Sequence, residues 1–269
     1  MKRVGLQLLL IVFLFCGTWF ILSRVDWMSL LSVEKTSKKT EEKLGDFYWS
    51  VLKKTEIEIH SDSVVSVLDT LLNRICIKNG IKVATIKLHL VQKNEINAFA
   101  LPNRHLVVYS GLINACENES ELCGILGHEI AHMERNHIMK KLVKEVGLSA
   151  LLSLTAGNAG SEIAKKTIRL LSSSAYDRKL ETEADLLSAD YLIKAGIDPE
   201  SFANFLYRFG IESNHLPDQL SWISTHPDSE ERAKEIVSYI KDKEIQKRPV
   251  LSNREWNLLK AIAVDVPEK

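Results

Sequence analysis

The sequence predicts an α+β fold that is mainly helical, with a small antiparallel sheet and an N-terminal transmembrane helix before it. Three observations predict this fold: a capped helical segment with two histidines four residues apart, two short segments of alternating or β-rich character, and an apolar N-terminus. The 269 residues, 45% of them hydrophobic and 26% charged, are typical of a globular chain with a substantial core.

Four parts of the chain differ in composition. We expect a membrane anchor or signal segment at 1–27, a juxtamembrane linker and leading helix at 28–60, the main domain at 61–245 and a C-terminal tail at 246–269. Within the linker, residues 32–46 are polar and rich in lysine.

The apolar N-terminus runs without a charge for 19 residues, from Val4 to Leu22, which is close to the roughly 20 that span a bilayer. A cleaved or lipidated signal is the alternative, although the residue before Cys16 is Phe15 and not a small one. Two positive residues at the start of the chain favour a cytoplasmic N-terminus. We therefore expect a single-pass membrane protein whose body is extracytoplasmic, or periplasmic.

Charge and cysteine content exclude some classes of protein. Lys+Arg and Asp+Glu both number 35, so the chain lacks the basic excess typical of nucleic-acid binding. The four cysteines show neither metal-type spacing nor a disulfide framework.

The main domain is expected to contain several helices and two strands. Apolar periodicity predicts a helix at 64–77, and alternation predicts a strand at 84–91. The segment HLVVY, between a turn at Pro102 and Asn103 and Gly111, predicts a second strand at 105–109. Asn118 and Glu121 resemble a helix cap that opens a helix reaching about Lys144. The uncharged stretch 146–161 is interpreted as a buried helix or a lid. Further helices are expected at 175–195, 199–211 and 228–242, with a short amphipathic piece near Trp256.

The segment HEIAH carries the clearest chemistry. His128 and His132 are four residues apart, so on a helix both imidazoles face the same side and can bind one ion, for which we expect zinc. Glu129 lies between them and is the expected general base, because it can accept a proton from a water that zinc acidifies. A chance HExxH on an exposed helix is the bland alternative.

A third ligand has to come from elsewhere. The spacing that would add a downstream histidine fails, because Arg135 and Ile138 occupy the required Gly and His positions, and His137 points away from the metal face. The segment ETEAD offers three acids, of which Glu183 lies nearest the apolar stripe that we expect on its helix. Glu183 is therefore the predicted ligand, and a solvated acidic face is the alternative.

With four motifs in order, residues 64–240 resemble a family of zinc endopeptidases that includes the heat-shock protease HtpX, the periplasmic proteases BepA, LoiP and YcaL, and a mitochondrial inner-membrane relative. These motifs are NAFALPNRHLVVYSGL, HEIAH, ETEAD and STHP. The resemblance implies a zincin-like peptidase domain, with one zinc per chain, that cleaves misfolded or misassembled proteins in or near membranes. It also implies that the strand 105–109 is an edge onto which an extended substrate adds.

The resemblance also assigns roles to single residues. It implies that Glu183 is the third zinc ligand, that Asp185 orients a ligand imidazole, and that His226 of STHP lies near the zinc. We interpret His226 either as a hydrogen-bond donor to the reacting carbonyl or as a latch on the fourth zinc position, and favour the latch. A plain turn residue is the third possibility. Leu186 departs from the family, in which many relatives carry Arg after EAD.

Function follows as a hypothesis with one rival. The sequence predicts a zinc metalloendopeptidase of protein quality control, whose partners are unfolded or misassembled proteins and, through its N-terminal helix, the lipid bilayer. The rival is a chaperone or assembly factor with a peptidase fold in which proteolysis is secondary. A purely structural metal site fits less well, because three ligands leave a position open.

Overall fold

The computed structural model forms two compact units, residues 1–38 and 39–269. It describes residues 38–155, 161–173, 175–212 and 221–264, and short pieces at 7, 12–14 and 16–20. Most of the expected transmembrane helix from Val4 to Leu22 thus lies outside the described residues. Among the residues that are described, no helix combines the length and apolar character needed to cross a membrane.

The sheet of the second unit has three strands and is mixed. The strands are β1 (Lys87–Val91), β2 (Ala98–Leu101) and β3 (His105–Tyr109), in the order β1-β3-β2. β3 is antiparallel to β2 and parallel to β1. The prediction of an antiparallel sheet was therefore only partly right, because β2 was missed and it supplies the only antiparallel pairing among the three strands.

The position of β3 corrects a second expectation. β3 lies between the other two strands and cannot be the edge onto which a substrate adds. The outer side of β1 is covered by the segment before α4, where Ile59 N donates to Leu90 O at 2.7 Å and Gln92 N donates to Ile57 O at 2.8 Å. In the described part of the chain, β2 is the strand whose outer side has no strand partner.

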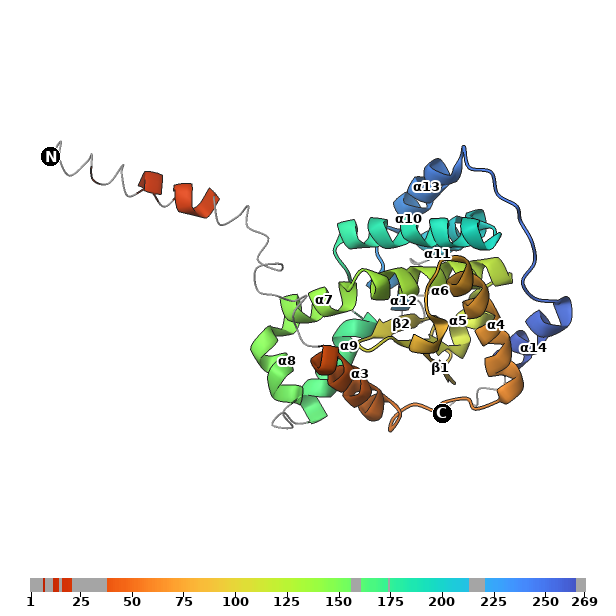
Figure 1. Cartoon of the computed structure of the whole chain (residues 1–269), viewed down its shortest axis with the longest axis horizontal. Coiled ribbons are helices and arrows are strands. Elements are labelled where there is room, and N and C mark those ends of the chain that lie inside the picture. The colour runs from red at the N-terminus through yellow and green to blue at the C-terminus, as the bar shows by residue number, and fades with distance from the viewer. Residues whose placement is uncertain are drawn as a thin grey trace. The chain divides into compact units, whose positions relative to one another are not determined.

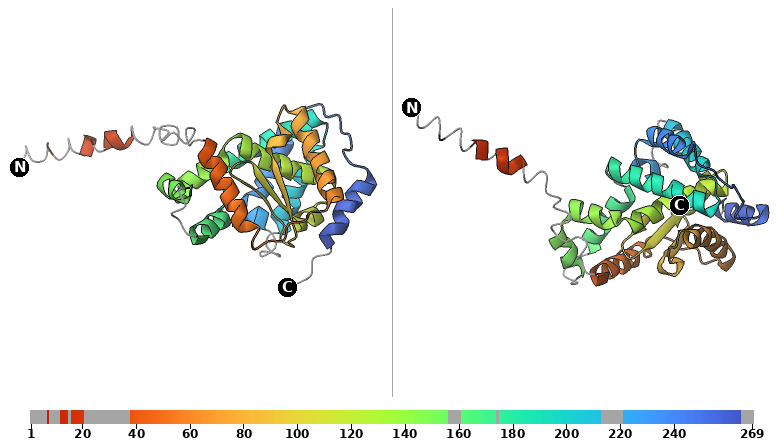
Figure 2. Two further views of the ribbon diagram at one scale, coloured as in Figure 1. Left: turned by 60° about the horizontal axis from the view of Figure 1, so that its bottom comes forward. Right: turned by 45° about the horizontal axis from the view of Figure 1, so that its top comes forward.

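Helices surround this sheet, as Figures 1 and 2 show. The predicted helices at 64–77, 199–211 and 228–242 are confirmed within two residues at each end. The helices are α3 (Lys38–Leu52), α4 (Asp62–Lys78), α5 (Ser110–Ala115), α6 (Glu119–Glu134), α7 (His137–Val146), α8 (Leu148–Thr155), α9 (Ser161–Ser173), α10 (Arg178–Ala195), α11 (Pro199–Glu212), α12 (Ser221–Thr225), α13 (Ser229–Ile240) and α14 (Asn253–Val264).

One segment differs from the sequence prediction, and another agrees with it in part. The lysine-rich part that was expected to be a linker contributes to α3, whose Gly45 touches the turn before β3: a Cβ there would lie 2.1 Å from Pro102 O. The uncharged stretch 146–161 contains α8, whose Leu151 and Leu154 are buried as expected of a buried helix, while residues 156–160 lie outside the described residues.

The helix expected from 119 to 144 is two helices. Its N-terminus is capped as predicted, since Asn118 Oδ1 accepts from Glu121 N at 3.0 Å. α6 then ends at Glu134, because Asn136 has φ of 55° and ψ of 28°, a left-handed conformation that an α-helix does not contain. The chain turns there and continues as α7.

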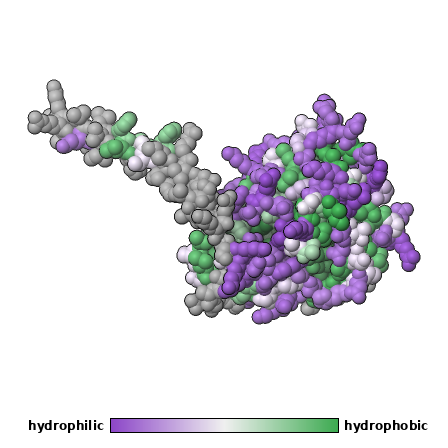
Figure 3. Space-filling model, viewed as in Figure 1, coloured by the Kyte–Doolittle hydropathy of each residue, from purple (hydrophilic) through white to green (hydrophobic). Residues whose placement is uncertain are grey.

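α6 lies between the sheet and α10, and this position defines the core (Figure 1). Two glycines let its neighbours approach closely. A Cβ on Gly124 would lie 2.3 Å from Phe202 Cβ of α11, and one on Gly127 would lie 2.7 Å from Ser188 Oγ of α10. Residues 121–133 of α6 are consequently all buried. Hydrophilic residues cover most of the face seen in Figure 3.

Candidate metal centre

α6 places both histidines of HEIAH on one side, as predicted. Nε2 of His128 lies 2.9 Å from Nε2 of His132, and both residues are fully buried. The 4-residue spacing of an α-helix produces this meeting, because residues i and i+4 lie one above the other. Two ring nitrogens therefore point at the same place.

The third acid in this place is Glu181 and not Glu183. Glu181 Oε1 lies 3.4 Å from His132 Nε2, and its Oε2 lies 3.6 Å from His128 Nε2. The side chain of Glu183 is 43% exposed, and it pairs with Arg135 at 3.0 Å. The prediction of Glu183 as a ligand was therefore wrong on geometry.

The reason lies in the rotation of α10 about its axis. Residues two apart on an α-helix point about 200° from each other, so Glu181 and Glu183 cannot share a face. The apolar stripe expected on this helix consisted of Leu180, Ala184, Leu187 and Tyr191, of which the structure buries Ala184 and Tyr191. The buried residues of α10 are 181, 184, 185, 188, 189, 191, 192 and 195, so the buried face includes Glu181 and leaves Glu183 outside.

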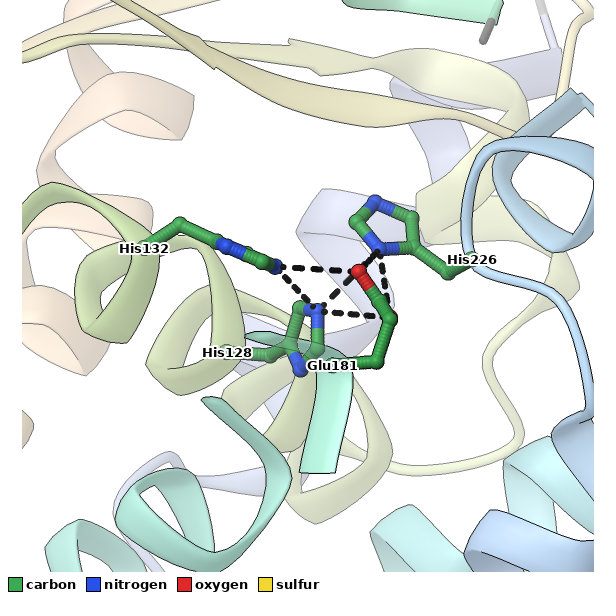
Figure 4. A group of neighbouring side chains, drawn as sticks. All are labelled: His128, His132, Glu181 and His226. Atoms are coloured by element: carbon green, nitrogen blue, oxygen red, sulfur yellow. Dashed lines mark hydrogen bonds and ion pairs between the residues drawn. The ribbon is translucent and has the colours of Figure 1, made fainter. Parts of the chain in front are cut away.

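His226, which follows α12, completes the group. Its Nδ1 lies 2.9 Å from both oxygens of Glu181 and 3.2 Å from His128 Nε2. One ligand atom from each of the four residues lies within 4.8 Å of the others, and all four residues are buried. Figure 4 shows these side chains converging from α6, α10 and the segment after α12.

A buried ion pair between Asp185 and Arg232 contacts His128 on the side away from the proposed metal position. Nδ1 of His128 lies 2.9 Å from Asp185 Oδ1, where the resemblance implied an orienting aspartate. Both oxygens of Asp185 accept from the Arg232 guanidinium, at 2.6 and 2.7 Å. Arg232 comes from α13 and also lies 2.8 Å from Glu181 Oε2.

Glu129 lies beside the group and is ionised. Its Oε1 accepts from Trp222 Nε1 at 3.1 Å and lies 3.4 Å from His226 Nε2. Burial would raise the pKa of Glu129, but the hydrogen bond and charge of His226 outweigh it and lower the pKa below its usual value. A carboxylate in this state can accept a proton.

The electrostatics of Glu181 and His132 fit a cation site. Burial would raise the pKa of Glu181, yet His226 and Arg232 hold it well below its usual value. Burial, followed by the charge of His128, lowers the pKa of His132 to about 4, which keeps this ring neutral. Neutral imidazole and ionised carboxylate are the forms that bind metals. Two histidines and one glutamate form a donor set that zinc takes in catalytic sites.

The comparison with known families agrees with this geometry. Residues 66–240 match peptidase family M48, which is well over half of the chain. This chain belongs to peptidase family M48. The matched range begins in α4 and ends with α13, so it contains the sheet and every residue of the candidate metal centre.

Curated relatives of this M48 chain are named as proteases. The beta-barrel assembly-enhancing protease of Yersinia pestis is 28% identical over 68% of the chain and 40% of its own length. The mitochondrial metalloendopeptidase OMA1 of Bos taurus is 33% identical over 64% of the chain and 36% of its own length. The beta-barrel assembly-enhancing protease of Escherichia coli (strain K12) is 25% identical over 82% of the chain and 47% of its own length. The chain thus matches under half the length of these three relatives.

The sequence held a signal for Glu181 that was not used. Glu181 and Asp185 are four residues apart, the same spacing as His128 and His132, so both can face one site from a second helix. Arg232 and Trp222 carry no such signal, because they approach from separate elements. Nor does Tyr176, which stacks on His132 with ring centroids 4.2 Å apart.

Proposed function

We propose that this chain is a zinc-dependent metalloendopeptidase that hydrolyses peptide bonds in misfolded or misassembled membrane or envelope proteins. The observation that carries the proposal is the buried group of His128, His132 and Glu181 beside an ionised Glu129. A protein that only binds peptides has no need of this carboxylate next to a metal site. Family membership and the protease names of the relatives support the same reaction.

The residues divide into holding and reacting groups. His128, His132 and Glu181 would hold the ion, and Asp185 with Arg232 would keep His128 and Glu181 in place. When bound, zinc polarises the scissile carbonyl and acidifies the attacking water. Glu129 accepts the proton that this water loses and delivers it to the leaving amine. Trp222 aims Glu129 by donating to its Oε1.

An extended substrate is proposed to bind along β2. This strand borders α6, which carries Glu129, and its outer side has no strand partner in the described part of the chain. Addition of a strand there supplies backbone hydrogen bonds that do not depend on substrate sequence. That independence suits an enzyme for unfolded proteins of many sequences.

The location of the enzyme is also a proposal. The 19-residue uncharged run with Lys2 and Arg3 before it supports a single-pass anchor with the body outside the cytoplasm. N-terminal sequencing of the membrane fraction tests the anchor, because a mature chain that begins after residue 16 or at a lipidated Cys16 contradicts it. If residues 28–269 were protected from added protease in spheroplasts, the body would lie inside the cytoplasm, which would contradict the proposed orientation.

Metal removal tests the reaction. The full chain, purified in a mild detergent, is expected to contain one zinc per chain and to cleave casein. Chelation should abolish the cleavage, and added Zn²⁺ but not Mg²⁺ should restore it, because imidazole donors suit zinc and not magnesium. Elemental analysis and a gel assay measure both quantities. Cleavage that continues after the metal has been removed would contradict the proposal.

Replacement of His226 by Ala tests whether this histidine blocks the fourth metal position. The position of His226 against Glu181 and His128 supports a latch that occupies the fourth metal position and keeps the enzyme latent. We expect His226→Ala to retain zinc and to cleave casein faster than the wild type. A fall of about 10²-fold or more would instead assign His226 to stabilising the reacting carbonyl. An unchanged rate would leave it as a turn residue.

A further inference from the structure

His137 lies directly behind His132, on the side away from the candidate metal position. Nδ1 of His137 is 2.9 Å from Nδ1 of His132, and His137 is fully buried at the start of α7. The break at Asn136 makes this contact possible, because a continuous helix would carry His137 away from His132. Sequence spacing had set His137 aside as a ligand, and the structure also keeps it outside the four-residue group.

The hydrogen bond between the two rings has a defined direction if His132 binds a metal through Nε2. That nitrogen then offers its lone pair, so the single proton of the neutral ring is on Nδ1. Nδ1 of His132 must donate, and Nδ1 of His137 must accept. The proton of His137 is consequently on its Nε2.

The far nitrogen of His137 points toward Glu183. Nε2 of His137 is buried and makes no hydrogen bond to any residue that the structure describes, and Glu183 Oε2 lies 3.4 Å from it. Glu183 in turn is held by Arg135 at 3.0 Å. Two side chains, those of His132 and His137, therefore lie between the metal position and Glu183. The negative charge of Glu183 favours the proton on Nε2 of His137.

We propose that His137 is a positioning residue that fixes the tautomer and ring orientation of His132 for metal binding, with Glu183 fixing His137 in turn. This inference rests on the proposed metal site. The two histidine ligands then have different partners at Nδ1: the Asp185 carboxylate lies beside Nδ1 of His128, and the neutral ring of His137 lies beside Nδ1 of His132.

The neutral partner of His132 limits the negative charge that is buried at this site. Three carboxylates, those of Glu129, Glu181 and Asp185, are already buried here beside the Arg232 guanidinium. A further carboxylate behind His132 would add buried negative charge, which is costly to desolvate. A neutral acceptor orients His132 without that cost, and it makes this ligand less basic than His128.

Replacing His137 in the full chain tests the proposal by zinc affinity, measured in competition with a chromophoric chelator. His137→Leu removes the acceptor, and His137→Asn keeps one, because Asn Oδ1 is bonded to Cγ as Nδ1 is in histidine. We expect Leu to weaken zinc binding about 10–100-fold, which is typical for loss of such a partner. We expect Asn to restore most of that loss. The zinc-induced rise in melting temperature should shrink in the same order.

His137→Gln keeps the test decisive if the Leu variant does not fold. Gln is polar and buried like Asn, but its amide corresponds to the Nε2 position and offers no acceptor to His132. Gln should therefore bind zinc as weakly as Leu, and Met139→Leu, a buried change on the same helix, should bind like the wild type.

Equal affinities of the Asn and Gln variants, or wild-type affinity in folded His137→Leu, would overturn the positioning role. The proposed function fails separately, since it fails only if the wild-type chain itself binds no zinc or cleaves nothing.

Discussion

Replacing Glu129 with Gln is expected to leave the zinc content unchanged and to lower the rate of casein cleavage about 10²–10⁴-fold. Gln has nearly the same shape and can still accept from Trp222, but its amide cannot take a proton. The change therefore removes the base without removing a ligand. Glu129 is suited to the role because its pKa is held below its usual value and it lies 3.4 Å from His226 Nε2.

A matched control exists on the same helix. Glu134 is exposed and pairs with Arg104 at 2.6 Å, so Glu134→Gln is expected to change neither zinc content nor cleavage rate. Near-normal cleavage by Glu129→Gln with full zinc would reject Glu129 as the base. If that variant lost cleavage but still supported envelope integrity in cells, the chaperone interpretation would replace the enzymatic one.

The second large effect, a loss of zinc binding, is expected from replacing Glu181 but not from replacing Glu183, two residues further along α10. Glu181→Gln should weaken zinc binding by more than the roughly 10–100-fold that loss of an outer partner costs, and should abolish cleavage. The amide is a poor zinc ligand, and it loses the charge that balances Arg232 and His226. Glu183→Gln should retain its zinc and lose at most the roughly 10–100-fold in affinity that loss of an outer partner costs, because its side chain is 43% exposed and reaches the group only through His137.

Elemental analysis and chelator competition on both variants distinguish the two positions. Circular dichroism of each metal-free variant serves as the folding control, since Glu181 is buried beside Arg232. Full, tight zinc in Glu181→Gln together with loss of zinc in Glu183→Gln would reverse the assignment and restore the ligand that the sequence had predicted.

The local features of the fold were predictable from the sequence because short-range rules determine them. The pair His128 and His132 follows from helix periodicity, and the cap at Asn118 follows from its spacing to Glu121. By contrast, β2 was missed, and with it the central position of β3. Strand order depends on pairing between distant segments, which the alternation of one strand does not report.

The break between α6 and α7 marks the limit of that local reasoning. Nothing in the apolar pattern around residue 136 forbids a longer helix, and Asn136 is a residue that either a helix or a left-handed turn accepts. Packing of the second helix decides between them, and the same turn brings His137 behind His132.

The sequence by itself determined the class of chemistry in this protein: an HExxH helix with a nearby acid, and membership of a metallopeptidase family. Only the tertiary structure decided which acid meets the histidines, and that His226 and Arg232 join them. The physical reason is that residue spacing sets angles within one helix, whereas the rotation of α10 against α6 is set by packing across their interface. At Gly127 and Ser188 that interface is close enough to turn Glu181 inward and Glu183 outward.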